Sequence, residues 1–281
     1  MFVLELSAEI EKSVPSFFDK HSGQHPLFFL KRMPMGIRYK MHKGKTPMDT
    51  NALLARYVNV KDGDRVLDLG CGFGESLLWL SEHFTITANG VSMSRKEVDK
   101  ARALARARNK KITIHQENML NTGFSDEAVS VVWAIESMCH VCHKEKFVTE
   151  AHRILETGGR LVIADFFLFG GRPWKFWERP LVKLFCRGFL VPAVCTVDEI
   201  TAALQLAGFS KIVYYDHTPD ILISSRKRAC LGLLNFLLGF PLIILRLMPK
   251  YVRLNTYGMI CQWFLFSKKV LAYGVVVAEK P

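Results

Sequence analysis

The 281-residue sequence has no internal repeat, no low-complexity tract and no excess of acidic residues. Acidic residues number 26 against 38 lysines and arginines, which gives a formal net charge of +12. This balance favours an anionic partner, either a nucleic acid or a membrane surface. Because 49% of the residues are hydrophobic, the chain can bury a real core, and we exclude a disordered tail and a coiled coil.

The cysteine content does not suit a disulfide framework. Seven cysteines are an odd number, in a chain too long to need disulfides for stability. The first residues also lack a basic start followed by an apolar run, because Glu5, Glu9 and Glu11 occur there. We therefore expect a reduced, cytoplasmic protein without a signal peptide.

Short β-branched runs alternate with helix-length segments between residues 61 and 166, and residues 94–109 have charges placed for a solvated helix. The predicted strands are residues 65–69, 111–115, 129–135, 160–164, 211–215 and 273–278. Strands and helices that alternate in this way predict an α/β fold, with a mostly parallel sheet and helices on both of its faces.

A glycine-rich loop follows the first predicted strand, with Gly70, Gly72 and Gly74 placed after Asp68. Glycines let the chain turn tightly and bring a ligand against the main chain at a helix N-terminus, which indicates a nucleotide-type site. A dinucleotide fingerprint needs glycine at position 75, but Glu75 stands there beside the expected pyrophosphate, so NAD is not expected. Asp68 would instead attract the ammonium and sulfonium charges of S-adenosylmethionine.

Residues 66–74, VLDLGCGFG, resemble the first motif of the class I S-adenosylmethionine-dependent methyltransferases. The chain also resembles later motifs of the branch that contains sterol, tocopherol and sugar-O methyltransferases. These motifs lie at residues 90–95, 117–119, 133–137 and 150–166. The resemblance implies a Rossmann-like fold with a seven-stranded, mostly parallel sheet whose last strand is reversed. Residues 216–272, too long for a loop and too apolar for a linker, are expected to form a helical lid.

We expect four regions along the chain. They are an N-terminal cap at 1–60, an S-adenosylmethionine-binding core at 61–215, an apolar helical lid at 216–270 and the last core strand at 271–281.

The resemblance also implies positions that contact the cofactor. In many relatives the second strand ends with an acidic residue that binds the ribose hydroxyls, but this chain has Ser92 there. Glu97, in the next helix turn, would accept hydrogen bonds from both hydroxyls. The alternative is that Glu97 is an ordinary solvated glutamate. Asn118 stands where relatives often accept a hydrogen bond from the adenine amino group. The expected cofactor-binding residues are Asp68, Gly70, Gly72, Gly74, Ser92, Glu97, Asn118, Met119 and Ile135.

Glu136, His140 and Asp165 follow the fourth and fifth predicted strands, where substrate approaches in this fold class. Methylation of a hydroxyl needs a base, and methylation of an alkene needs a group that stabilises a cation and then removes a proton. Residues 136–140, ESMCH, resemble the sterol methyltransferase pattern, whereas the sugar-O branch has paired histidines, so Cys139 favours carbon methylation. The alternatives are a helix-start histidine bonded to the backbone for His140 and a helix N-cap for Asp165.

Residues 139–143 also spell C-x-x-C-H, a pattern typical of covalent haem attachment. We do not expect haem, because its attachment follows export and the sequence shows no export signal. A zinc site made of Cys139, Cys142 and His143 would lack a fourth ligand, so no metal is expected. The four-residue spacing predicts that Cys139 and His143 share one helix face and pack there.

The 17 apolar residues 229–245 have basic flanks. As a helix they reach only about 25 Å, against about 30 Å of membrane hydrocarbon, and Asn235 and Pro241 interrupt them. They are expected to be either a lid packed on the sheet and substrate or a helix in the membrane interface. The aromatic residues of 166–169 and 174–177, with Phe185 and Phe189, would line an apolar substrate site.

Together these features predict an S-adenosylmethionine-dependent methyltransferase that methylates carbon in a hydrophobic isoprenoid or sterol-like lipid. The alternatives are an O-methyltransferase of a small natural product or sugar, and a non-catalytic cofactor-binding protein attached to membranes. A peripheral membrane surface is a possible partner. Nucleic acid is not expected, because the basic residues between 102 and 111 have the spacing of a solvated helix face. Basic residues between 31 and 45 suit either a diphosphate or headgroup, or an exposed arm; the oligomeric state stays open.

Overall fold

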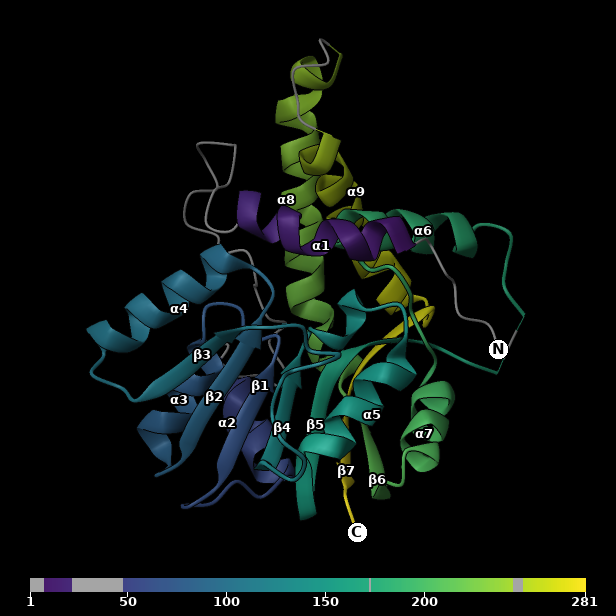
Figure 1. Cartoon of the computed structure of the whole chain (residues 1–281). Helices are drawn as coiled ribbons and strands as arrows, with labels where there is room; N and C mark the ends of the chain where they lie inside the picture. Colours follow the sequence, from purple (N-terminus) through teal and green to yellow (C-terminus); the bar gives the residue numbers. More distant parts are fainter. Residues whose placement is uncertain (1–7, 22–47, 172, 245–249) are drawn as a thin grey trace.

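The structure is a computed structural model that describes residues 8–21, 48–171, 173–244 and 250–281. These residues form a seven-stranded sheet with the strand order β3-β2-β1-β4-β5-β7-β6 (Figure 1). The strands are β1 (Arg65–Leu69), β2 (Thr87–Ser92), β3 (Ile112–Gln116), β4 (Val129–Ile135), β5 (Leu155–Leu168), β6 (Ser210–Asp216) and β7 (Leu271–Glu279). Strands β1 to β5 are parallel, and β7 is antiparallel to β5 and β6. The predicted fold class, with its reversed last strand, is confirmed.

Helices cover both faces of the sheet. They are α1 (Ala8–His21), α2 (Met48–Tyr57), α3 (Glu75–His83), α4 (Arg95–Ala107), α5 (Lys144–Ile154), α6 (Glu178–Phe189), α7 (Val197–Leu206), α8 (Thr218–Ile244) and α9 (Lys250–Ser267). Successive strand residues point to opposite faces, so Val66 packs with α2 and α3 while Leu67 packs with α5. The sheet is therefore the middle layer between two hydrophobic cores.

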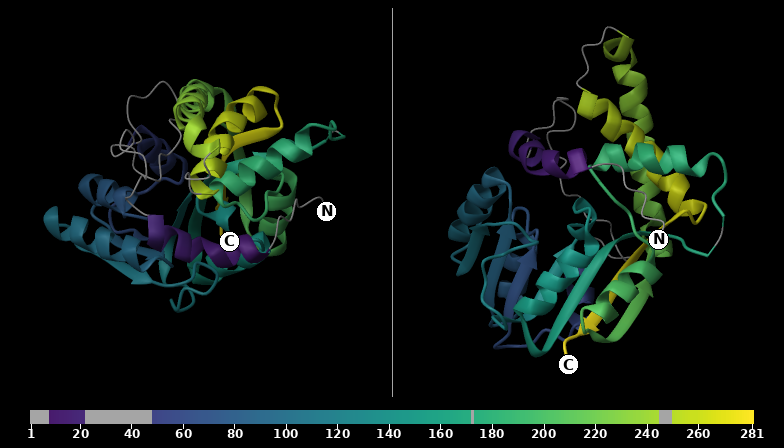
Figure 2. Two further views of the ribbon diagram at one scale, coloured as in Figure 1. Left: turned by 90° about the horizontal axis from the view of Figure 1, so that it is seen from above. Right: turned by 45° about the vertical axis from the view of Figure 1, so that its right-hand side comes forward.

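Helices α1, α6, α8 and α9 lie beyond the carboxyl end of the parallel strands (Figures 1 and 2). Helices α8 and α9 pack together as a hairpin, and α9 also packs along α6. The α6–α9 contact is close at Gly188, where a Cβ atom would lie 2.5 Å from the carbonyl oxygen of Leu254. The hairpin is thus held to the core on its α9 side. Its role as a lid stays a prediction.

The start of α8 is fixed to the core by hydrogen bonds. The hydroxyl of Tyr57 lies 3.0 Å from Nε2 of His217, and Nδ1 of His217 lies 2.7 Å from a carboxylate oxygen of Asp220. The hydroxyl of Thr218 accepts a hydrogen bond from the main-chain amide of Tyr273 in β7. These contacts tie the base of the hairpin to α2 and to strand β7.

Strand β5 is longer than the sequence predicts. Its pairing with β4 ends where Ala164 lies opposite Ile135, but its pairing with β7 continues until Leu168 lies opposite Leu271. The antiparallel partner therefore extends the strand beyond its parallel neighbour. Asp165 lies within β5, and the expectation that it follows the strand as a helix N-cap is wrong.

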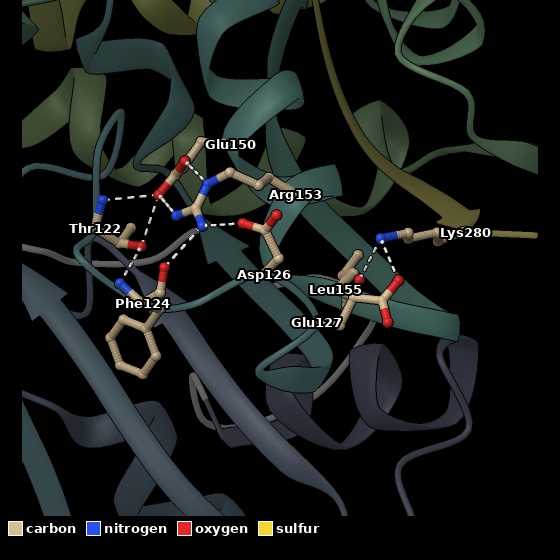
Figure 3. Close-up of polar contacts among 8 residues, drawn as sticks. All are labelled: Thr122, Phe124, Asp126, Glu127, Glu150, Arg153, Leu155 and Lys280. Atoms are coloured by element: carbon tan, nitrogen blue, oxygen red, sulfur yellow. Dashed lines mark hydrogen bonds and ion pairs between the residues drawn. The ribbon is translucent and has the colours of Figure 1, made fainter.

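A buried carboxylate connects α5 to the loop that precedes β4 (Figure 3). Glu150 accepts hydrogen bonds from the amide and hydroxyl of Thr122 and from the guanidinium of Arg153, which also contacts Asp126 and the carbonyl of Phe124. Burial alone would raise the pKa of Glu150, but the hydrogen bonds from Arg153 and Thr122 lower it below its ordinary value. The network stabilises the ionised carboxylate.

Replacing Glu150 by glutamine, which keeps the shape but removes the charge, is expected to lower the free energy of unfolding by about 1.5–3 kcal/mol at pH 7. Because the folded-state pKa of Glu150 is lowered, its contribution is present above the unfolded pKa and is lost as pH falls through the folded pKa. Urea unfolding should therefore show the difference between Glu150→Gln and the parent shrinking towards pH 4. Glu145→Gln, on the same helix with a 64% exposed side chain, is the control and should change stability by less than about 0.5 kcal/mol. An equal loss in both variants would contradict the assignment.

Candidate functional site

The glycine loop has the conformation that its sequence predicts. Gly70, Gly72 and Gly74 have φ values of +85°, +54° and +75°, in the left-handed region that glycine adopts easily. A Cβ atom at Gly70 would lie 2.5 Å from the Cβ atom of Ser137, so only glycine lets the loop approach the end of β4. A Cβ atom at Gly72 would meet nothing within 4 Å. The main chain at Gly72 therefore borders open space at the start of α3.

The expected ribose-binding residues touch each other. Ser92 ends β2, and its hydroxyl donates a hydrogen bond to Oε2 of Glu97 at 2.8 Å. Glu97 lies in the first turn of α4, where its main-chain amide donates to the side chain of the N-cap Ser94. Asp68 is buried in β1, one strand away. The carboxylate of Glu97 is thus held at the end of β2.

The remaining expected cofactor contacts lie at the ends of β3 and β4. Oδ1 of Asn118 accepts a hydrogen bond from the main-chain amide of Leu120 at 2.9 Å, which fixes the turn after β3. Met119 is buried against the glycine loop, with its methyl group 3.3 Å from the Cβ position of Gly70. Ile135 is the buried last residue of β4. The structure therefore gathers these residues along one edge of the sheet.

Ser137 is a further candidate that the sequence analysis quoted in a motif without giving it a role. Its hydroxyl is buried and has no hydrogen-bond partner among the described residues. Because buried polar atoms are nearly always paired, this hydroxyl calls for a ligand or water beside the glycine loop. The structure identifies Ser137 by this buried hydroxyl and by its close contact with Gly70. The sequence motif alone does not indicate that this serine lies in the site.

Glu136 has a strained backbone at the carboxyl end of β4. Its φ is +49°, which is uncommon for a residue with a long side chain, and its amide donates to the carbonyl of Ala164 at 2.8 Å. The hydroxyl of Tyr273, in β7, donates to Oε1 of Glu136 at 3.2 Å. Tyr273 was not among the expected site residues, because 137 positions separate it from Glu136. Strain of this kind is typical of functional positions.

His140 is held as a neutral base. Its Nδ1 lies 2.9 Å from the carbonyl oxygen of Leu190, just after α6. Since a carbonyl only accepts, Nδ1 carries the proton and Nε2 carries the lone pair. Burial lowers the pKa of His140 to about 4, with nearby Lys144 acting in the same direction and the hydrogen bond to Leu190 opposing it. The alternative of a backbone-bonded histidine therefore describes Nδ1 and leaves Nε2 able to accept a proton.

Asp165 holds main chain and is fully buried. Its two carboxyl oxygens accept hydrogen bonds from the amides of Cys139 and Phe166, each at 2.9 Å. Burial raises the pKa of Asp165 to about 7; Lys144 and these amides lower it, and Glu136 raises it further. Through Cys139, Asp165 fixes the turn that carries His140.

Lys144 fixes the same turn from its other side, and the sequence analysis did not identify it. Its ammonium group is buried and donates to the carbonyls of Met138 and Val141, both at 2.7 Å. The turn is a short 3-10 helix, Met138–His140, and α5 begins only at Lys144 after the N-cap His143.

The expectation that Cys139 and His143 share one helix face is wrong, because the chain breaks between two helices. Cys139 is buried, whereas the side chain of His143 is 51% exposed. In the part of the chain that the structure describes, no group of three His, Cys, Asp or Glu residues could hold a metal ion. None of the seven cysteines forms a disulfide.

Helix α1 crosses over this edge of the sheet (Figure 1). Near its start, Glu11 accepts a hydrogen bond from the amide of Cys142 at 3.1 Å, and near its end Asp19 accepts one from the hydroxyl of Ser94 at 2.7 Å. Between them, the ring of Phe18 packs edge-on against His140. Helix α1 therefore connects the turn of His140 with the start of α4. The basic residues between 31 and 45 lie outside the described residues.

Comparisons with known proteins agree with this geometry. Residues 67–163 match the family model described as a methyltransferase domain. The solved geranyl diphosphate C-methyltransferase of Streptomyces coelicolor, in complex with Mg²⁺, geranyl diphosphate and S-adenosyl-L-homocysteine, has a TM-score of 0.72 at 17% identity and covers 98% of this chain and 99% of its own. Residues 67–163 are therefore a methyltransferase domain, in agreement with the resemblance to class I S-adenosylmethionine-dependent methyltransferases.

The chain is also similar to curated relatives whose names refer to methylation at different atoms. It is 31% identical over 157 residues to the 27-O-demethylrifamycin SV methyltransferase of Amycolatopsis mediterranei, which is 55% of this chain and 57% of the relative. It is 41% identical over 112 residues to the geranyl diphosphate 2-C-methyltransferase of Saccharopolyspora erythraea, 39% of each chain. The chain spans about half the length of the curated relatives it matches.

S-adenosylmethionine is the cofactor of this family, and the site fits it. The open space at Gly72 allows close approach to the main chain, and the buried hydroxyl of Ser137 lacks a partner among the described residues. The carboxylate of Asp68 suits the cationic amino-acid part of the cofactor, and that of Glu97 suits its ribose. Neither carboxylate would be repelled by a phosphate, because this cofactor has none.

Changing Gly72 to alanine is expected to weaken S-adenosylmethionine binding at least about tenfold, because the added methyl group enters the space beside the loop. Isothermal titration calorimetry with S-adenosylmethionine and its demethylated product measures this effect. Gly63→Ala is the matched control, since Gly63 also has a positive φ, +88°, and open space around its Cβ position, but lies before β1. Equal loss of binding in both variants would indicate backbone strain rather than a filled site.

Proposed function

We propose that this methyltransferase transfers a methyl group from S-adenosylmethionine to a carbon atom of a hydrophobic isoprenoid or sterol-like lipid. One observation carries the proposal: Glu136 directly follows β4, a neutral His140 lies on the turn after it, and the ring of Phe18 packs against His140. A carboxylate and a base together are what methylation of an alkene requires, whereas a hydroxyl needs only the base.

Aromatic residues support an apolar substrate. Phe18 packs against His140 from α1, and Phe166 in β5 packs edge-on against Phe185 of α6 with ring centroids 5.3 Å apart. Phe185 in turn contacts Phe189 at 5.0 Å, one residue before the Leu190 that binds His140. Aromatic faces also stabilise a cation, which suits positive charge that develops on an alkene after it receives a methyl group.

The residues have separate roles in this proposal. When bound, S-adenosylmethionine supplies an electrophilic methyl group. Glu136, held by Tyr273, stabilises positive charge on the substrate, and Nε2 of His140 accepts the proton whose loss restores the double bond. Asp165 and Lys144 position the turn through Cys139, Met138 and Val141. The cofactor is held by Asp68, Gly70, Gly72, Gly74, Ser92, Glu97, Asn118, Met119 and Ile135.

A second candidate is O-methylation of a smaller natural product. It is favoured by the protonation state of His140, since a neutral imidazole is sufficient to remove a hydroxyl proton. The rifamycin relative carries an O-methyltransferase name, and the geranyl diphosphate relative carries a C-methyltransferase name. The linkage in the product distinguishes the two candidates.

Incubation of the purified chain with methyl-labelled S-adenosylmethionine and separate panels of isoprenoids, sterols and phenolic compounds tests the proposal. We expect label in an isoprenoid or sterol fraction, attached through a carbon–carbon bond that survives acid and alkali. Label found only as a methyl ether would overturn carbon methylation and support the second candidate. Nuclear magnetic resonance of the product identifies the methylated atom.

Changing His140 to alanine, or Glu136 to glutamine, is expected to lower turnover at least about 100-fold while cofactor affinity stays within about twofold. His143→Ala is the matched control, because His143 is exposed at the start of α5 and should leave turnover unchanged. Since the pKa of His140 is about 4, the base stays neutral from about pH 8 down to about pH 5, and its contribution to turnover should fall only as pH approaches 4. Full turnover by His140→Ala would remove this residue from the mechanism.

A further inference from the structure

Helix α8 exposes a cluster of leucines that nothing in the proposed reaction uses. Leu233 and Leu234 are each 50% exposed, Leu237 is 60% exposed and Leu238 is 64% exposed. We call these four residues the leucine face. Single exposed leucines are common, but four on two consecutive helical turns form a contiguous apolar patch, which in soluble proteins marks an interaction site.

The leucine face is not the inner side of the hairpin. The inner side of α8 is made by small residues such as Gly232, whose Cβ position lies 3.0 Å from the Cβ atom of Met259 in α9. Helix α9 then packs on α6, so the hairpin is already braced on that side. In Figures 1 and 2 the hairpin projects beyond α1 and α6, away from the sheet. The exposed leucines therefore lie on an outward surface of a braced projection.

The charge of this segment is of one sign. Between residues 221 and 278 the sequence has eight lysines and arginines and no aspartate or glutamate. On α8, Arg226 and Lys227 are exposed two to three turns before the leucine face. Arg226 lies on the same side of the helix as Leu233 and Leu237, and Lys227 lies on the same side as Leu234 and Leu238. A partner surface that complements this segment must be negatively charged throughout. A layer of anionic lipid headgroups meets this requirement.

A second copy of the chain suits the leucine face less well. A symmetric contact between two leucine faces would bring the cationic segments of both copies together, with no acidic residue between 221 and 278 to compensate them. Among the described residues, no helix is long and apolar enough to span a membrane. An interfacial position remains, with leucines below the headgroups and basic residues among them.

We propose that the leucine face and the exposed basic residues Arg226 and Lys227 dock this protein on an anionic membrane surface. The distance along α8 from Arg226 to Leu233–Leu238 is about 10–18 Å, so tilted insertion of the leucines places the basic residues near the headgroup level. This inference does not rest on the substrate or on carbon methylation. Docking would hold the carboxyl edge of the sheet, where α8 begins, close to the lipid.

Flotation of the full chain with vesicles tests the proposal. We expect binding to vesicles of phosphatidylcholine with about 30% phosphatidylserine, and at least about tenfold weaker binding to phosphatidylcholine alone. Raising the salt concentration should weaken the interaction with anionic vesicles, because exposed charges are screened. Equal binding to both kinds of vesicle, or none to either, would overturn the proposal.

Two sets of variants separate the leucine face from general basicity. The combined change Leu234→Gln, Leu237→Gln and Leu238→Gln should reduce vesicle binding at least about tenfold, since it removes the apolar anchor while keeping residues that favour a helix. The matched control is Leu206→Gln on α7, whose leucine is 90% exposed on another part of the molecule. Arg226→Gln with Lys227→Gln should also weaken binding, whereas Arg106→Gln with Lys111→Gln should not.

Circular dichroism and S-adenosylmethionine binding confirm that each variant is folded. If the leucine variant binds anionic vesicles as the parent does, the leucine face is not the docking surface. If the parent forms a dimer that the leucine variant loses, and the parent does not float with vesicles, a second copy covers the face and the membrane proposal is wrong. If Arg106→Gln with Lys111→Gln weakens binding as much as the α8 pair does, the contact is unspecific attraction of a basic protein.

Discussion

The close contact between Gly70 and Ser137 is the constraint on which the site depends. It joins the turn after β1 to the turn after β4, with no space for a side chain at Gly70. On one side of the contact lies the open space at Gly72, and on the other lies Glu136 in its strained conformation. In the proposed function, this contact between Gly70 and Ser137 fixes the position of the cofactor site relative to that of Glu136.

The turn that carries His140 is rigid because its main-chain groups are bonded to buried charged or polar side chains. Asp165 takes the amide of Cys139 from the β5 side, and Lys144 takes two carbonyls from the α5 side. His140 itself is bonded to the end of α6 through Leu190. Rigid support of this kind suits catalysis, since a base is effective only when it is held within hydrogen-bonding distance of its proton.

The same chain divides into two chemically different parts. The sheet and its covering helices carry mixed charges, with ion pairs such as Glu150 and Arg153 (Figure 3). After Asp220, in its first turn, the α8–α9 hairpin carries no acidic residue, and it exposes leucines instead. The first part has the fold that is shared with many methyltransferases, whereas the second has the surface that would give this chain its own location.

The sequence by itself determined the fold class, the cofactor and most strand positions. Residues 65–69 and 129–135 were predicted as strands with the bounds that the structure has, because short apolar runs bounded by glycines and polar turns favour buried strands. The glycine loop was equally plain, since its spacing and the acidic residue before it carry the chemistry locally. These signals all lie within short stretches of chain.

Only the tertiary structure decided what depends on distant partners. The extension of β5 past Asp165 comes from β7, more than 100 residues later, so no local pattern shows it. The same holds for the hydrogen bond between Tyr273 and Glu136, for that between His140 and Leu190, and for the buried hydroxyl of Ser137, which has no partner among the described residues. The break before Lys144 was missed because helix periodicity alone places Cys139 and His143 together. A hydrogen bond from the amide of Cys139 to Asp165, and one from Lys144 to a carbonyl, stabilise a separate 3-10 turn. Local sequence fixes which groups are present, but burial and long-range hydrogen bonds decide which of them act.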